Sequence, residues 1–173
     1  MKINTKQEPA VHLRSKSCLI RVLSVQSALY CRALLERYRA EGADKLLLLG
    51  DLLYHGPRND LPDGYAPKEV IAQLSELKNE ILCVRGNCDT EVDQMVLDFP
   101  ILADYALLYA GSRAVFATHG HHYNTACPPP LAKGDILLHG HTHVPAWQEF
   151  GSGNLYLNPG SVSYTHLRAH ETG

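Results

Sequence analysis

The sequence has no apolar run long enough to cross a membrane and no strong excess of either charge. The leucine run at residues 46–49 ends at Gly50 and Asp51, whereas a membrane span needs about 20 apolar residues. Sixteen basic and eighteen acidic residues give a formal net charge of −2, which provides no general attraction for polyanions. We therefore expect no membrane contact and no bulk nucleic-acid binding.

Paired cysteines at zinc-binding spacing are also absent. The five cysteines, at positions 18, 31, 83, 88 and 127, are odd in number and form no Cys-x-x-Cys motif, so we expect no structural zinc site. No stretch near the start has the pattern of a secretory leader. These features favour reduced thiols and a cytoplasmic location.

Hydrophobic periodicity predicts a first sheet of parallel strands covered by helices. Residues 28–40 and 68–77 carry apolar side chains at helical spacing, and Gly42 is expected to end the first of these helices. Predicted strands alternate with them at residues 18–23, 45–49 and 81–84. This alternation favours parallel pairing with helices packed on the sheet.

Beyond Pro100 the pattern changes to short strands separated by glycine turns. Gly111 and Ser112 are expected to form a hairpin between two of them. Four strands are predicted, at residues 105–109, 114–118, 136–139 and 154–157. With 173 residues and 45% hydrophobic content, the chain suits one domain. The fold class is α/β, with two packed mixed sheets flanked by helices.

Polar motifs follow the predicted strands at four places. They are Gly-Asp at 50–51, Gly-Asn-Cys-Asp at 86–89, Thr-His-Gly-His at 118–121 and Gly-His-Thr-His at 140–143. Strand ends in an open α/β sheet converge on one crevice, so we expect these side chains to gather there. The candidate metal ligands are Asp51, Asn87, His119, His141 and His143. Mixed oxygen and imidazole ligands suit a transition metal better than calcium.

Two metal ions fit this ligand set better than one. Asp51 could bridge two cations about 3.5–4 Å apart, and such a pair polarises a phosphoryl group, generates hydroxide from water and clamps the substrate for in-line attack. Phosphoester hydrolysis is therefore the leading hypothesis, with Asp51, Asn87 and His119 as the catalytic residues.

These motifs resemble those of the calcineurin-like metallophosphoesterases, and in particular the small bacterial YfcE-type phosphodiesterases. From about residue 28 to residue 163 the chain carries LLGDLLYHGPRN, VRGNCDTEVDQ, THGH, GHTHVP and NPGSVS in the family's order. The resemblance implies an αββα sandwich that binds two divalent metals, often manganese, and hydrolyses a small-molecule phosphodiester. It also implies Asp51 as the bridging ligand, Asn87, His119 and His141 on one metal, and His143 on the other.

One departure from the family weakens this site. The family's first strand ends in Asp-x-His, which completes the metal bound by His143, but Leu23 and Val25 stand in those places here. That metal would keep two protein ligands, too few for firm binding, so we expect it to bind weakly and activity to be impaired. The alternative is a catalytically dead scaffold or binding module of the same fold. A single-metal protein that binds a nucleotide without turnover also stays open.

The two ends of the chain depart as well. Residues 1–17 and 164–173 carry none of the motifs on which the resemblance rests, so we expect a disordered or non-native start, a domain at residues 18–163 and a non-native tail. The tail replaces a further hairpin of the family. An exposed sheet edge left in this way invites pairing with another chain, which makes a homo-oligomer a further expectation.

Several residues near the motifs are candidates for contact with substrate. His55, Arg58 and Asn59 follow Asp51, and an arginine there offers a bidentate fork to a phosphate; an exposed loop arginine without a role is an equal alternative. Cys88 stands where many relatives carry a histidine that protonates the leaving group. A thiol is a poorer acid than a histidine for this purpose, so phenolate-like leaving groups are expected. Alternatively, Cys88 is only a small side chain that fills space in the core.

Three further expectations concern local geometry. His121 is expected to line the cleft. Asp89 is expected to form an Asx turn rather than to bind metal. His141 and His143 would point to opposite faces of a regular strand, so Gly140 is expected to supply the turn that brings both to the metals.

Overall fold

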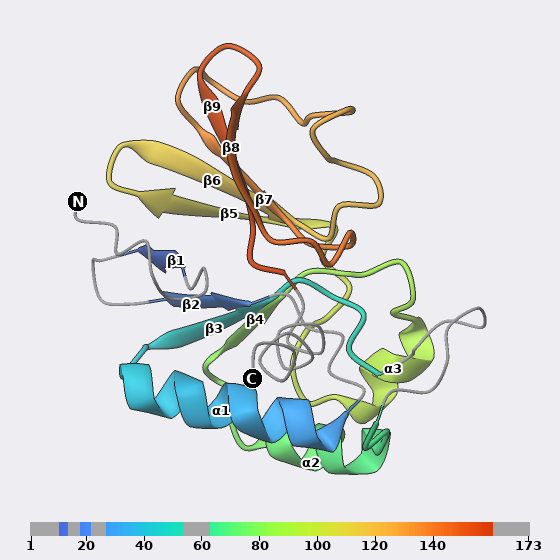
Figure 1. The fold of residues 1–173 in the computed structure, drawn as a ribbon. Helices are drawn as coiled ribbons and strands as arrows, with labels where there is room; N and C mark the ends of the chain where they lie inside the picture. Colours follow the sequence, from blue (N-terminus) through green and yellow to red (C-terminus); the bar gives the residue numbers. More distant parts are fainter. Residues whose placement is uncertain (1–10, 14–17, 22–26, 54–62, 161–173) are drawn as a thin grey trace, which may run out of the picture.

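Two β-sheets pack face to face, and helices cover the outer face of the first (Figure 1). The computed structural model describes residues 11–13, 18–21, 27–53 and 63–160. None of the helices in these ranges has the length and hydropathy of a membrane span. The predicted arrangement of two sheets flanked by helices is confirmed.

The first sheet has four strands in the order β1-β2-β3-β4. Strand β1 (Val11–Leu13) is antiparallel to β2 (Cys18–Arg21), whereas β2, β3 (Lys45–Leu48) and β4 (Ile81–Cys83) run parallel. Residues 46–49 are fully buried, because helices cover one face of this sheet and the second sheet covers the other. A strand buried on both faces is typically a continuous apolar run, which explains the four leucines.

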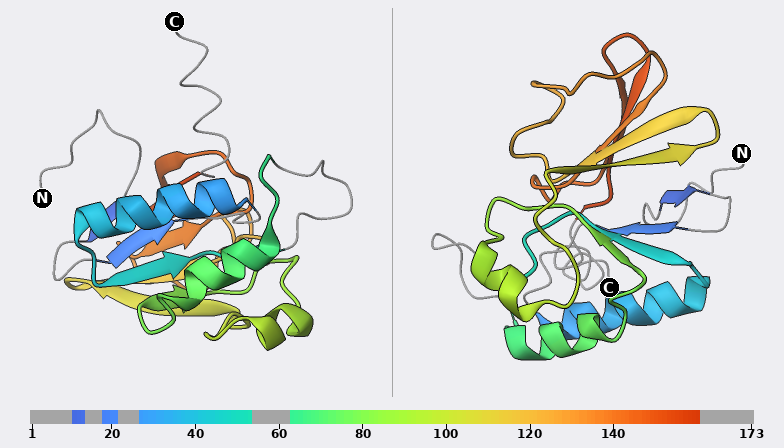
Figure 2. Two further views of the ribbon diagram at one scale, coloured as in Figure 1. Left: turned by 90° about the horizontal axis from the view of Figure 1, so that it is seen from below. Right: turned by 180° about the vertical axis from the view of Figure 1, so that it is seen from behind.

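Helices α1 (Ala28–Glu41) and α2 (Pro67–Ser75) lie side by side on the outer face of the first sheet (Figure 2). As predicted, α1 ends at Gly42, whose φ of 60° allows its N–H to bond the carbonyl of Arg39. Pro67 begins α2 at a position where a missing N–H costs nothing. Helix α3 (Glu91–Val96) was not predicted, although Thr90 and Asp93 form a capping box at its start.

The second sheet has five strands in the order β5-β6-β7-β9-β8. They are β5 (Tyr105–Ala110), β6 (Arg113–Thr118), β7 (Ile136–His139), β8 (Ala146–Phe150) and β9 (Asn154–Asn158). Strands β6, β7 and β9 run parallel, while β5 and β8 are antiparallel edges. The Gly111 hairpin joins β5 to β6 as predicted, whereas β8 was missed.

The leucine run divides its side chains between two cores. Leu46 and Leu48 face the helices, while Leu47 and Leu49 face the second sheet. The core between the sheets also contains Val84, Val115, Ala117, Ile136, Leu138, Leu155 and Leu157. This packing fixes the distance between the ends of β3 and β4 and the ends of β6 and β7.

We expect Leu47→Ala to lower the free energy of unfolding by about 2–5 kcal/mol, because it leaves a cavity between the two sheets. Urea denaturation followed by circular dichroism measures the change. Leu107→Ala is the matched control, since Leu107 is 52% exposed on β5, and a shift within about 0.5 kcal/mol is expected there. Equal effects of the two substitutions would contradict this assignment of the core.

Candidate metal centre

Four chain segments that leave parallel strands meet at one edge of the sandwich. Asp51 follows β3, Asn87 follows β4, His119 follows β6 and His141 follows β7. The first two strands belong to the first sheet and the other two to the second. The site therefore lies where the carboxyl ends of strands from both sheets come together, as expected for an α/β fold.

The Nε2 atom of His119 is the centre of this group. It lies 3.3 Å from Oδ2 of Asp51, 3.1 Å from Nδ1 of His141 and 3.0 Å from Oδ1 of Asn87. Asp51, His119 and His141 each offer one ligand atom within 4.8 Å of the others. Four of the five predicted ligands thus come together in space.

The hydrogen-bonding capacity of these atoms fits a cation. Nδ1 of His119 lies 2.5 Å from the carbonyl oxygen of Leu49, so this nitrogen carries the proton and Nε2 of the neutral ring carries a lone pair. In this neutral form Nε2 has no proton to share with the acceptor oxygens of Asp51 and Asn87 that face it. A divalent metal satisfies such a set, and a ligating histidine that donates its second N–H to a carbonyl is the usual arrangement.

The backbone is strained at three of the predicted ligands. Asp51, His141 and His143 have φ values of 57°, 62° and 60°, in the left-handed region that non-glycine residues rarely adopt. Each costs about 1–3 kcal/mol and persists only where surrounding contacts impose it. The prediction that Gly140 supplies this freedom is wrong, because Gly140 does not have a positive φ and the two histidines themselves make the turn.

Asp89 holds the two loops of the first sheet together. Its carboxylate accepts hydrogen bonds from the backbone N–H groups of Asp51 at 2.8 Å, Leu52 at 2.9 Å and Gly86 at 2.7 Å. The side chain is 2% exposed. Burial raises the pKa of Asp89, and these three bonds oppose the rise. The structure thus gives Asp89 a role across loops in place of the predicted Asx turn.

Two glycines let these loops approach backbone to backbone. A Cβ atom on Gly50 would lie 2.3 Å from the amide nitrogen of Gly86, and one on Gly86 would lie 2.1 Å from Oδ1 of Asp51. Both distances are far inside van der Waals contact. The same Oδ1 accepts the N–H of Cys88 at 2.9 Å. The Asp51 carboxylate is therefore aimed by the loop that carries Asn87.

Asn158 supports the histidine loop of the second sheet. Its Nδ2 lies 3.1 Å from the carbonyl oxygen of Gly140 and 2.9 Å from Oγ1 of Thr142, and its Oδ1 accepts the N–H of Gly160. Asn158 is 1% exposed. These bonds hold the turn in which His141 adopts its left-handed conformation.

Protonation states near the site suit metal binding. Burial lowers the pKa values of His141 and His143, so both rings are neutral at neutral pH, which is the form in which an imidazole binds metal. Burial would raise the pKa of Asp51 and lower that of His119, but the hydrogen bond and charge attraction between Asp51 and a protonated His119 outweigh burial and shift both pKa values the other way; the N–H of Cys88 also lowers the pKa of Asp51. A divalent cation between the two residues would replace that proton. Asp51 is therefore ionised at neutral pH.

The other predicted residues divide into three groups. His143 is part-buried but lies outside the cluster of Asp51, His119 and His141 found among the described residues. Cys88 and His121 border the site: the ring of His121 lies 5.3 Å from that of His119, and burial is the main reason its pKa falls to about 4. Lying outside the described residues are Leu23, Val25, His55, Arg58 and Asn59.

Two buried residues beside the centre were not predicted. Asn158 lies within the NPGSVS motif, and His139 is the last residue of a predicted strand. His139 is 2% exposed and stacks on Tyr156 with ring centroids 4.4 Å apart. Alternation along β7 could have placed His139 on the face opposite Leu138.

Comparison with known proteins places this geometry in a family. The calcineurin-like phosphoesterase superfamily domain matches residues 26–172. The chain belongs to this superfamily. It is 46% identical over 129 residues to phosphodiesterase YfcE of Escherichia coli K12, which covers 75% of this chain and 70% of that protein. The similarity to probable metallophosphoesterase YsnB of Bacillus subtilis is 33% over 96 residues, or 51% of this chain and 52% of YsnB.

A solved structure agrees with the superfamily assignment. The structure of YfcE, described as a phosphoesterase from E. coli, superposes with a TM-score of 0.80 at 41% sequence identity. The match covers 84% of this chain and 79% of that one. The family and fold predicted from the motifs are therefore confirmed, while the roles of individual site residues stay predictions.

We expect Gly86→Ala to abolish tight metal binding, because its Cβ would collide with Asp51 Oδ1 and with the backbone N of Asp51. Calorimetric titration with Mn²⁺ measures the affinity. Gly111→Asn is the control: nothing lies within 4 Å of a Cβ at Gly111, and asparagine tolerates its positive φ. Unchanged Mn²⁺ affinity in Gly86→Ala would disprove the proposed contact.

We expect Asn158→Ala to lower metal affinity about 10-fold, the usual effect of removing a group that orients a ligand. It removes the bonds to Gly140 and Thr142. Asn154→Ala is the matched control, since Asn154 is also buried on β9 but its Nδ2 binds the carbonyl of Ala132. Both variants should lose about 1–3 kcal/mol of stability, and only Asn158→Ala should weaken Mn²⁺ binding.

Proposed function

We propose that this chain is a metal-dependent phosphodiesterase that hydrolyses small-molecule phosphodiesters. The observation that carries the proposal is the convergence of Asp51, Asn87 and His141 on Nε2 of His119. Membership of the calcineurin-like phosphoesterase superfamily and the similarity to phosphodiesterase YfcE supply the reaction class.

Five residues hold the metals in this proposal. Asn87, His119 and His141 would hold one ion and His143 the second, Asp51 would be shared between them, and Mn²⁺ would be the preferred ion. The second ion binds weakly, because Leu23 and Val25 stand where two further ligands would be. Divalent ions at such a site polarise the phosphoryl group and make water nucleophilic.

The chain's own residues prepare the site before substrate arrives. The carbonyl of Leu49 fixes the orientation of the His119 ring, and the N–H of Cys88 fixes the Asp51 carboxylate. Holding the ligand atoms in place in advance avoids reorganisation during the reaction. His55, Arg58 and Asn59 are assigned to the substrate phosphate on sequence alone.

Cys88 and His121 border the reacting groups. Burial first, and then the charges of Asp51 and Asp89, raise the pKa of the Cys88 thiol to about 11, so it stays protonated and uncharged. Such a thiol is a weak proton donor, which favours phenolate-like leaving groups that need no protonation. His121 is neutral at neutral pH and can accept a hydrogen bond from substrate.

The cysteines support a cytoplasmic location. Cys31, Cys83, Cys88 and Cys127 are unpaired in the described part of the chain. Free thiols are typical of a reducing compartment, and we assign the protein to the cytoplasm on this ground. Homo-oligomer formation remains a hypothesis from sequence.

A catalytically dead scaffold is the second candidate. The observation in its favour is Leu23 and Val25 in place of the Asp-x-His pair. One observation argues against the scaffold. Asp89, Gly86 and Asn158 hold the ligand loops in strained conformations, which the folding of the sandwich alone does not require.

The deciding experiment measures Mn²⁺ content and hydrolysis of bis-p-nitrophenyl phosphate. We expect His119→Ala to lower both the bound metal and the rate at least about 100-fold, since losing a ligand costs at least as much as losing a group that orients one. His122→Ala is the matched control, because His122 is an exposed neighbour outside the cluster. Turnover unaffected by His119→Ala would overturn the proposal.

A second comparison separates the two candidates. The double variant Leu23→Asp, Val25→His restores the family's missing pair. An enzyme impaired only at its second ion gains activity and a second equivalent of Mn²⁺. A scaffold shows no turnover either with or without the restored pair.

A further inference from the structure

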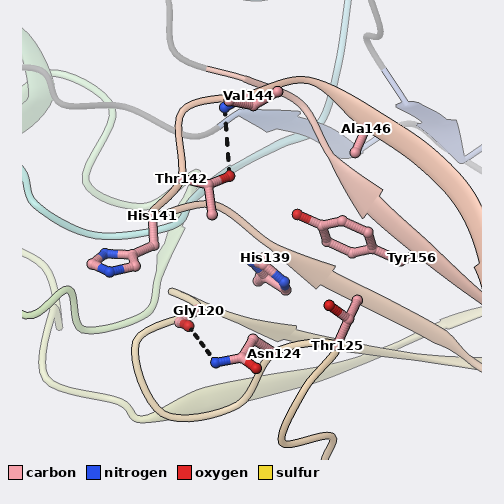
Figure 3. Close-up of a pocket in the computed structure, with 9 residues that line it drawn as sticks. All are labelled: Gly120, Asn124, Thr125, His139, His141, Thr142, Val144, Ala146 and Tyr156. Atoms are coloured by element: carbon pink, nitrogen blue, oxygen red, sulfur yellow. Dashed lines mark hydrogen bonds between the residues drawn. The ribbon is translucent and has the colours of Figure 1, made fainter.

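A cavity of about 430 Å³ adjoins the metal centre, within the usual range for small-molecule sites. It lies between the loop that follows β6 and the outer face of the second sheet, where His139 of β7 and Tyr156 of β9 form an aromatic wall (Figure 3). His141 stands at its edge with its ring turned away from Tyr156. The same residue thus borders the cavity and the metal cluster.

The walls of the cavity are largely apolar. Among the described residues, no lysine, arginine, aspartate or glutamate lines the cavity. Val144, Ala146 and the two stacked rings provide apolar surface, while Asn124 and Thr125 provide polar groups on the opposite side. The two rings stack on each other and are 2% and 6% exposed, so a flat aromatic partner would pack against the ring surface that they leave at the cavity wall.

His139 adds a specific polar group. Its Nδ1 lies 3.1 Å from the carbonyl oxygen of Gly140, so Nδ1 carries the proton and Nε2 an unshared pair. Nε2 is buried and has no partner among the described residues. A buried acceptor of this kind costs free energy until a donor reaches it, and nucleobases carry such N–H donors at their edges.

We propose that this cavity binds the flat, uncharged ring of one ester group of a phosphodiester whose phosphate sits at the metal centre. The inference rests on the proposed function for the position of the phosphate. The ring is either an aryl group or a nucleobase, which share the same flat apolar faces. The cavity thereby selects ring-bearing diesters over alkyl diesters.

The test uses phosphate monoesters. Each carries the phosphate and one ester group of the proposed substrate, but it lacks the diester bond that the proposed reaction cleaves. Calorimetric titration of the Mn²⁺-loaded chain compares methyl phosphate, phenyl phosphate and adenosine 5′-monophosphate. Because the ring is buried on binding, at least one ring-bearing ligand should bind about 10-fold more tightly than methyl phosphate. Equal affinities for all three would overturn the proposal.

Narrowing the cavity should remove this preference. We expect Ala146→Leu to reduce the advantage of the ring-bearing ligand below about 3-fold, because the added side chain fills ring space. Thr125→Trp, at an exposed position on the opposite wall, serves the same purpose if Ala146→Leu fails to fold. Leu107→Ala on β5 is the control and should keep the full preference. A preference that survives both cavity variants places the ring elsewhere and overturns the proposal.

His139→Phe distinguishes the two sources of the ring, since phenylalanine keeps the stacking on Tyr156 but removes the acceptor. If His139→Phe lowers the affinity for adenosine 5′-monophosphate about 5-fold and leaves that for phenyl phosphate unchanged, the ring is a nucleobase. A tight phenyl phosphate complex without a matching gain for the nucleotide supports an aryl group.

A metal-free measurement separates this inference from the proposed function. Saturation-transfer spectra with phenol and adenosine, which lack phosphate, should show ring contact in the wild-type chain and lose it in Ala146→Leu. Ring contact in a chain that binds no Mn²⁺ would support the ring site and contradict the metal-dependent reaction. Mn²⁺ binding and turnover without ring contact would support the reaction and contradict the ring site.

Discussion

One buried carboxylate, that of Asp89, is the interaction on which the rest of the centre depends. It binds the amides of Asp51, Leu52 and Gly86 at once, so the loops after β3 and β4 are held as one unit. A carboxylate is suited to this task because it offers about four acceptor positions and no proton. Asp51 can adopt its left-handed backbone only because these bonds and the glycines at positions 50 and 86 leave it no relaxed alternative.

In the second sheet, the side-chain amide of Asn158 holds the ligand loop in the same way. Asn158 binds the carbonyl of Gly140 and the hydroxyl of Thr142, and the turn between them presents His141. Each half of the site thus consists of a strained ligand loop and one buried side chain from a neighbouring segment that holds it. Rigid support of this kind is what positions functional groups accurately, and both supports lie outside the ligand set.

Much of the fold could be predicted because its signals are local. The leucine run, the helical spacing before Gly42 and the Gly111 hairpin are each visible within a few residues, and all are confirmed. Strand β8 was missed because its exposed edge carries a polar Gln148 and Glu149 without clear alternation. The prediction for Gly140 was wrong. Sequence reasoning assigns a positive φ to glycine, whereas here His141 and His143 adopt it because long-range hydrogen bonds hold their turn. Nothing near Asp89 in the sequence reveals that two of its three backbone partners lie 37 and 38 residues away.

The bond between His119 and the carbonyl of Leu49 joins a residue of the second sheet to the end of a strand of the first. Every ligand set built on His119 therefore spans the boundary between the two layers. An ion held there would connect the two sheets, so its binding energy would stabilise their packing. Substitutions deep between the sheets, far from any ligand atom, would then change the metal affinity by shifting one sheet against the other.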